Sequence, residues 1–225
     1  MKILFYLPFF LILSCKTIEI KNGENILKKE IVFNDNFTSL KVDSGIELLL
    51  LQNDSLTQKL KLDKNYANLL RFNIENGTLS ISKKNKDIKT TITAYLSFNS
   101  LSKIEAAEGS KIKGLNFLTG HKITVKSLSG GLIDLKVKTE IIDCTATGGS
   151  KIVLAGFSDF VFLQAKNGSD IFAYKLNAKT GNLISISASI IKSTITEDVY
   201  IYKKNIGRVH LKGNPKIHNE NIIKF

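Results

Sequence analysis

Short stretches in which apolar and polar residues alternate fill the first half of the chain, and this is the period of a half-buried β-strand. Residues 56–62 alternate leucine with polar residues, and residues 71–82 contain two alternating stretches on either side of Asn76-Gly77. An Asn-Gly pair between alternating stretches is the strongest short-range signal of a β-hairpin with a type I′ turn. These residues therefore predict antiparallel strands.

Two segments of the first half depart from alternation. Residues 46–51 are almost continuously apolar, which predicts a strand buried on both faces. Residues 66–70 are the one place where a short helical turn fits the pattern. Because no amphipathic stretch reaches the length of an ordinary helix, we expect an all-β fold that begins with N-terminal antiparallel strands and hairpins over residues 31–102.

After residue 102 the pattern becomes periodic. Six small residues recur at intervals of 21, 19, 19, 20 and 19, and an isoleucine follows three positions later in five of the six pieces. The small residues are Gly109, Gly130, Gly149, Gly168, Ala188 and Gly207, and the isoleucines are Ile112, Ile133, Ile152, Ile171 and Ile191. A period of this length without helical segments indicates stacked β-coils.

The two recurring residue types have separate physical roles in such a stack. Glycine tolerates a positive φ and takes no space where the chain turns sharply, so the small residues should form the corners. The isoleucines should point inward and stack on one another, because one coil cannot bury its apolar face alone. The pattern predicts a β-solenoid of about five to six turns over residues 103–216. His210 replaces the last isoleucine, and Pro215 cannot donate to a strand ladder, so this coil should cap the solenoid.

Several of these motifs resemble those of the head GIN domain family, which is labelled an auto-transporter adhesin family. The resemblance rests on the hairpin at residues 76–81, the Gly-Ser-x-Ile repeats and the closing residues 211–215, and it covers residues 36–216. It implies a secreted or lipid-anchored envelope protein of Gram-negative bacteria, with a right-handed parallel β-helix and no assigned catalytic residue. Residues 95–101 lack the proline that the family often carries before its first repeat.

The N-terminus predicts the compartment. Residues 3–13 form an apolar run interrupted by Pro8, which is too short to span a bilayer and fits a signal peptide over residues 1–14. The run ends in Ile12-Leu13-Ser14-Cys15, the pattern of a bacterial lipobox. We expect Cys15 to be lipidated and to hold the chain at the cell envelope, on the outer membrane. The alternative is an ordinary signal peptide followed by a chance cysteine.

Polar segments flank the predicted domain. Residues 15–30 are charged and polar and should form a flexible tether, and residues 217–225 should form a C-terminal tail. The second cysteine, Cys144, lies in an apolar, strand-like run with no histidine nearby in sequence. We therefore expect it to be a buried structural residue and not a nucleophile.

The formal net charge of +12 invites a nucleic-acid interpretation, which the distribution of charge does not favour. Only two basic residues, Arg71 and Arg208, are arginines, and the lysines are spread along the whole chain. Nucleic-acid readers concentrate arginine and aromatic residues on one face, so no nucleic-acid partner is expected. Attraction to anionic glycans or lipid headgroups stays open.

No catalytic or metal-binding pattern is visible in the sequence. Relative to the small residue of their coil, Asp134 lies at +4, Asp159 at +10 and Asp170 at +2, so the acids should not form a stacked ladder. His121, His210 and His218 lack metal-ligand spacing, and no cofactor motif is present. Asp54-Ser55-Leu56 resembles a bacterial O-glycosylation acceptor, which makes Ser55 a candidate modification site.

Two functional hypotheses follow. The first is a non-catalytic adhesion or structural module whose strand-lined faces bind a glycan, an envelope polymer or a protein. The second is a carbohydrate-active β-helix enzyme, similar to a polysaccharide lyase, which would need clustered acids and a basic residue on one face. The scattered acids and the absence of tryptophan favour the first. End-to-end self-assembly is disfavoured, because both ends of the solenoid should be covered.

Overall fold

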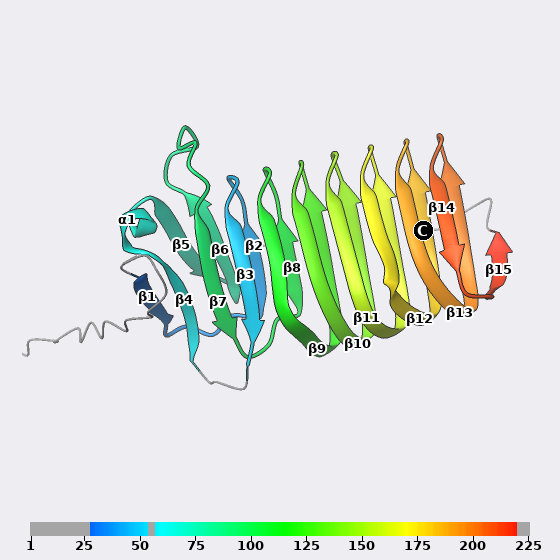
Figure 1. Cartoon of the computed structure of the whole chain (residues 1–225), viewed down its shortest axis with the longest axis horizontal. Coiled ribbons are helices and arrows are strands. Elements are labelled where there is room, and N and C mark those ends of the chain that lie inside the picture. The colour runs from blue at the N-terminus through cyan, green and yellow to red at the C-terminus, as the bar shows by residue number, and fades with distance from the viewer. Residues whose placement is uncertain (1–27, 54–56, 220–225) are drawn as a thin grey trace, which may run out of the picture.

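The computed structural model describes residues 28–53 and 57–219, and it shows β-coils stacked along one axis (Figure 1). The predicted all-β solenoid is confirmed, since every described element except one four-residue helix is a strand. All fifteen strands belong to one continuous sheet that winds around itself. The predicted signal peptide, Cys15 and Ser55 lie outside the described residues.

The helix and the fifteen strands have the following bounds. In chain order they are β1 (Lys28–Phe33), β2 (Ser39–Val42), β3 (Glu47–Gln52), β4 (Gln58–Asp63), α1 (Lys64–Ala67), β5 (Leu70–Glu75), β6 (Thr78–Lys83), β7 (Thr93–Phe98), β8 (Lys103–Ala106), β9 (Lys111–Leu128), β10 (Leu132–Thr147), β11 (Lys151–Lys166), β12 (Asp170–Ile186), β13 (Ile190–Lys204), β14 (Arg208–Lys212) and β15 (Lys216–Asn219).

Each long strand from β9 to β13 contributes most of one coil. The strand runs along one side, curves through a rounded bend and returns along the other side to a sharp two-residue turn, here called the tip. In Figure 1 the tips lie along the upper edge and the bends along the lower edge. We call the outer surface between tip and bend face A, and the outer surface between bend and the next tip face B. Neighbouring coils pair in parallel and in register along both sides.

The tips show why a small residue recurs. Each tip holds two consecutive residues with positive φ. The φ of the second residue lies between +59° and +74° in five tips, at Gly109, Gly130, Gly149, Gly168 and Ala188.

The sixth predicted corner needs a correction. Asn205 and Ile206 form the last tip, with φ of +49° and +64°. Gly207 lies one position later, where a Cβ would overlap the carbonyl oxygen of Ser185.

The isoleucine stack lies directly inside face A. Ile112, Ile133, Ile152, Ile171 and Ile191 are paired in order between successive coils, and each is fully buried. Burying such a side chain contributes about 1.5–3 kcal/mol relative to leaving it exposed, so the stack is a major stabilising element. Val209 continues it in the last coil, because Ile191 pairs with Val209. The expectation that His210 takes this place was wrong: His210 pairs with Lys192 and is exposed on face A.

The N-terminal strands extend the solenoid, and their order in the stack differs from their order in the chain. β2 pairs in parallel with β6 and β8, and β3 pairs in parallel with β7 and β9. Gly45, with φ of +67°, therefore forms a tip in the register of Gly109, and Leu48 pairs with Ile112. The expected antiparallel pairing occurs at β1–β4, β4–β7 and the β5–β6 hairpin around Asn76-Gly77.

Three segments differ from the sequence pattern. Residues 46–51 are not buried on both faces, because Ile46, Leu48 and Leu50 are buried whereas Leu51 is 38% exposed. β1 begins at Lys28, within the predicted tether, and pairs with β4. β15 follows Pro215 and pairs with β13, so the solenoid continues into the predicted tail.

A single apolar cluster fills the interior from Phe37 to Ile201 and joins the N-terminal coils to the repeats. Cys144 belongs to this cluster, is fully buried and is a free thiol, as expected. Burial raises the pKa of its thiol well above the ordinary range. In the part of the chain that the structure describes, no helix is long and apolar enough to span a bilayer.

Candidate functional site: a groove along the bends

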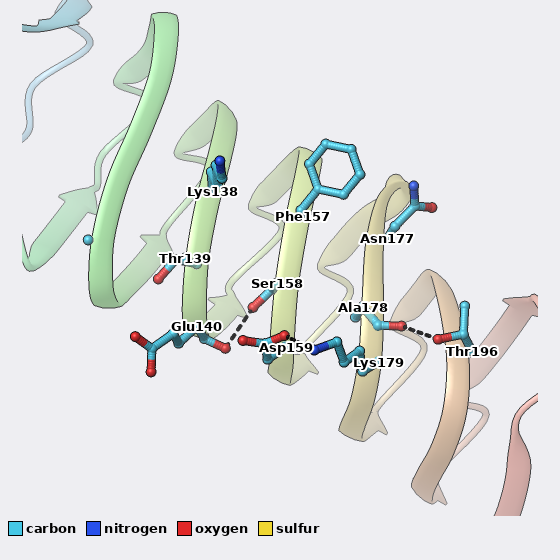
Figure 2. A pocket seen from close by; sticks show the side chains of 11 residues that line it. Lys138, Thr139, Glu140, Phe157, Ser158, Asp159, Asn177, Ala178, Lys179 and Thr196 are labelled. Atoms are coloured by element: carbon cyan, nitrogen blue, oxygen red, sulfur yellow. Dashed lines mark hydrogen bonds and ion pairs between the residues drawn. The ribbon is translucent and has the colours of Figure 1, made fainter.

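A groove of about 480 Å³ crosses the bends of β10, β11 and β12 (Figure 2). Its axis follows the stack, because Thr139 pairs with Ser158 and Ser158 pairs with Ala178. The residues on either side of this central row are consequently also side by side. Figure 2 shows Lys138, Phe157 and Asn177 along one wall, and Glu140, Asp159 and Lys179 along the other. We call this site the bend groove.

The central row holds the bends together. Thr139 Oγ1 lies 2.9 Å from the carbonyl oxygen of His121 and 3.1 Å from that of Ile141. Ser158 Oγ makes the equivalent contacts, at 3.2 Å to the carbonyl of Glu140 and 2.9 Å to that of Phe160. A hydroxyl has one proton to donate. Here each hydroxyl shares its proton between a carbonyl of the preceding coil and a carbonyl of its own coil. These hydroxyls therefore satisfy the backbone where the strand ladder is interrupted.

The charged wall holds one ion pair and one histidine–carboxylate contact, each of which joins two neighbouring coils. Asp159 Oδ1 lies 2.6 Å from Lys179 Nζ, and Glu140 Oε2 lies 2.9 Å from His121 Nδ1. The hydrogen bond to Asp159 raises the pKa of the Lys179 ammonium above its ordinary value. All four side chains are more than half exposed, so water screens the pairs and they contribute little to stability. They leave the wall with alternating charge that suits polar ligands.

The opposite wall offers groups without partners. Phe157 is 56% exposed, which is unusual for a large aromatic side chain. The side chains of Lys138 and Asn177 make no hydrogen bond or ion pair to another described residue. Phe117, on the adjoining β9 bend, is 47% exposed. The ring of Phe117 lies close to Gly156 in β11, because a Cβ added to that glycine would be only 3.1 Å from Phe117 Cε1. The wall thus presents apolar rings beside a free cation and a free amide.

The two hydroxyls of the central row are not aligned as nucleophiles. Neither Thr139 nor Ser158 faces a histidine or carboxylate that could act as a base, because both hydroxyls are directed at carbonyl oxygens. Within residues 28–53 and 57–219, no group of three or more His, Cys, Asp or Glu side chains could hold a metal ion. The groove offers groups for reversible contact, namely ring stacking, hydrogen bonds and charge pairing.

The structure places the acids considered in the sequence on different surfaces of the solenoid. Asp134 and Asp170 lie on face A, and Asp143 lies on face B. Asp159 lies in the bend groove beside Glu140, which the search for acids overlooked. Both follow their coil's corner glycine by ten residues, so the shared offset was present in the sequence. The two carboxylates nevertheless form no isolated acidic pair, since each has a cationic or imidazole partner.

The histidines lie apart from one another. His121 is at the bend, His210 is on face A, and His218 is on face B with its Nε2 2.9 Å from Asp198 Oδ1. Gly109, Gly130, Gly149, Gly168 and Ala188 lie at the tips and Gly207 beside the last tip, whereas the isoleucine stack lies in the interior. None of these residues lines the bend groove.

Comparison with known proteins identifies relatives of the whole β-structure. A family model described as "Putative auto-transporter adhesin, head GIN domain" matches residues 36–215. No curated protein matches the sequence. Among solved structures, a putative adhesin from Parabacteroides merdae superimposes with a TM-score of 0.68 at 16% identity, over 86% of this chain and 91% of its own.

Two structures from Parabacteroides distasonis are also similar. A putative adhesin matches with a TM-score of 0.66 and 16% identity over 86% of this chain and 92% of its own. A putative lipid binding protein matches with a TM-score of 0.57 and 14% identity over 87% of this chain and 93% of its own. At such low identities these similarities establish the shared fold alone.

Proposed function

Because this chain belongs to the head GIN domain family, we propose that it is a non-catalytic binding module of the bacterial cell envelope. In this proposal a lipid on Cys15 anchors the chain in the outer membrane, and the solenoid presents the bend groove to a glycan, an envelope polymer or a protein. The anchor and the groove involve different residues, so they are tested separately.

One observation supports binding over catalysis. In the bend groove the carboxylates and hydroxyls have partners within the protein, whereas an aromatic ring and a lysine ammonium remain available for contact. Asp159 is paired with Lys179, and the Ser158 hydroxyl is shared between carbonyls. Phe157 and Lys138 remain available on the other wall. An enzyme similar to a polysaccharide lyase would need a cluster of acids free to hold a cation, but here Glu140 and Asp159 are each paired with another side chain.

The binding proposal is tested with soluble residues 22–225 on an array of glycans, envelope polymers and matrix proteins, with bound polysaccharides monitored for degradation. We expect reproducible binding without turnover, and Phe157→Ala should weaken it about tenfold because a stacked ring is lost. Phe172→Ala is the matched control, since Phe172 lies on face A between Lys151 and Lys192. Turnover of a polysaccharide, or equal loss in both variants, would contradict the proposal.

The anchor is tested in the producing cell. Wild-type chain should partition with membranes and carry the mass of acyl chains on Cys15, whereas Cys15→Ser should be released by cell fractionation. A Cys144→Ser variant controls for loss of a thiol, because Cys144 is fully buried in the interior. Membrane association that persists in Cys15→Ser would show that another part of the chain provides the attachment.

A further inference from the structure

Face B carries a second groove, of about 360 Å³, near the C-terminal end of the stack. Its walls come from β11, β12 and β13, at Phe162, Asn182, Tyr200 and Tyr202. We call it the tyrosine groove. It is separate from the bend groove, with which it shares no lining residue.

The register of the coils places aromatic rings on both sides of an amide. Phe162 pairs with Asn182, and Asn182 pairs with Tyr200, so these side chains form one outward row. Neighbouring strands in a sheet lie about 4.8 Å apart, which separates the two rings by roughly 10 Å with the amide between them. Tyr202 stands in the next outward row, two residues along from Tyr200.

An apolar side chain closes the base of the groove. Ile184 pairs with Gln164 and Tyr202 on the outward side of β12, yet it is only 6% exposed. It does not belong to the interior apolar cluster. The surrounding side chains on face B therefore shield it. This enclosure gives the groove an apolar base below polar edges.

The polar groups of the groove are available to a ligand. The amide of Asn182 and the phenol groups of Tyr200 and Tyr202 make no hydrogen bond to any other residue that the structure describes. Tyr200 is 43% exposed. One side of its ring is held by His218, whose ring stacks on it at 4.6 Å between centroids with an interplanar angle of 14°. His218 is itself fixed by Asp198 at 2.9 Å. The Tyr200 ring is thus oriented before any ligand binds.

The groove has no charged lining residue, although the chain has a net charge of +12. This favours a neutral ligand over the anionic ligands that most of the surface would attract. The ligand must also combine flat apolar surface for the rings with hydroxyl groups for the amide and the phenols. A pyranose ring has this combination, since its C–H face is apolar and its edge carries hydroxyls.

Two other kinds of ligand fit less well. A peptide that adds a strand needs an open sheet edge, but β12 is hydrogen-bonded on both sides, to β11 and β13. An acyl chain needs an enclosed apolar cavity, whereas this groove lies on the surface of a sheet and has an amide in its wall. We infer that the tyrosine groove binds an uncharged sugar unit of a glycan. The inference rests on the proposed binding function and gives it a ligand class.

The test uses the complete mature chain with Cys15→Ser, titrated with maltohexaose, cellohexaose and mannohexaose. Hexagalacturonate and dodecanoate represent the anionic and acyl alternatives. Because the chain contains no tryptophan, tyrosine fluorescence and near-ultraviolet circular dichroism report directly on the five tyrosines of the mature chain. We expect at least one neutral hexasaccharide to bind and to perturb these signals. Saturation-transfer NMR should show the strongest transfer to the C–H protons of the sugar.

Single substitutions locate the site. Tyr202→Ala and Asn182→Ala should each weaken binding about five- to tenfold, because one removes a stacking ring and the other the central amide. Tyr95→Ala is the matched control: Tyr95 is 44% exposed but lies on face A at the far end of the stack, and its loss should change the Kd less than twofold. Unchanged thermal unfolding of each variant shows that the fold is retained.

The alternative outcomes separate this inference from the broader proposal. Binding of a neutral sugar that is lost only in Phe157→Ala would overturn the tyrosine groove and support the bend groove. If dodecanoate or hexagalacturonate bound in the tyrosine groove and none of the neutral sugars did, the inferred ligand class would be wrong. The ligand would then be an acyl chain or an anionic glycan. Failure of all three neutral sugars in a chain that binds another ligand on the array would overturn the inference and leave the binding function standing.

Discussion

Gly131→Ser is a substitution for which the sequence repeat and the structure predict opposite effects on stability. In the corresponding position after the tip, four other coils carry Ser110, Ser150, Ser169 and Ser189. A consensus argument would therefore expect Gly131→Ser to be neutral or stabilising. The structure predicts the opposite, because a Cβ on Gly131 would lie 2.5 Å from the carbonyl oxygen of Ala106.

The cost follows from the rigidity of that carbonyl. Ala106 ends β8, which is paired on both sides, with β2 and with β9, so its backbone cannot move without disturbing neighbouring coils. Overpacking of this kind costs about 1–3 kcal/mol, and we expect Gly131→Ser to lose about 2 kcal/mol. Gly149→Ala provides the comparison: its φ is +69°, and a Cβ there would meet nothing within 4 Å. Only the left-handed backbone penalises it, by about 1 kcal/mol.

Guanidinium unfolding followed by circular dichroism measures both variants at equal protein concentration. A third variant combines Ser127→Ala with Gly131→Ser. It removes the second contact, at 3.0 Å to Ser127 Oγ, but leaves the Ala106 carbonyl in place. We expect it to regain less than half of the lost stability. If Gly131→Ser were as stable as wild type, or no less stable than Gly149→Ala, the reasoning from close approach would be refuted.

Three further predictions concern the interior and the bends. Ile152→Ala should lower the free energy of unfolding by about 2–5 kcal/mol, since Ile152 is fully buried in the stack, whereas the exposed His210→Ala should change it by less than about 0.5 kcal/mol in the same assay. In a Cys15→Ser chain, iodoacetamide should modify Cys144 only in denaturant, as judged by intact mass. Burial raises the pKa of this thiol in the folded state, so its contribution to stability should be complete below about pH 8.5 and decline as the pH rises above that value, a decline absent from Cys144→Ala. Thr139→Val keeps the shape but removes the shared hydroxyl, and calorimetry should show a loss of about 1 kcal/mol; an unchanged melting temperature would contradict the role assigned to that hydroxyl.

The solenoid could be predicted because each coil repeats the same local requirements. Gly149 and Gly168 recur where the backbone needs positive φ, and Ile152 and Ile171 recur where a side chain must fill the interior. The same reasoning failed at the last coil. There Ile206 adopts the left-handed conformation that sequence rules assign to glycine, and the glycine at the next position serves close approach instead.

The two grooves could not be predicted, because irregular bends shift the register between coils. Lys179 stands beside Asp159, but it follows its corner residue by eleven positions and not by ten. The tyrosine groove is shifted further: Phe162, Asn182 and Tyr200 follow their corners by 13, 14 and 12 residues, respectively. A fixed period therefore conceals side chains that the coils place in one row.

The β2–β3 coil has a consequence for the order of folding. It pairs with residues 64 positions later, as Ser39 with Lys103, whereas coils in the repeat pair at a distance of about 20 residues. Closing the longer loop costs about 1 kcal/mol more in chain entropy. The local contacts after Gly109 should consequently form first, and the β2–β3 coil should dock onto a finished edge. During synthesis β2 and β3 emerge before the partners in β6 to β9 with which they pair. For that interval β2 and β3 expose unpaired edges, which makes this coil prone to pairing with the wrong strand or with another chain.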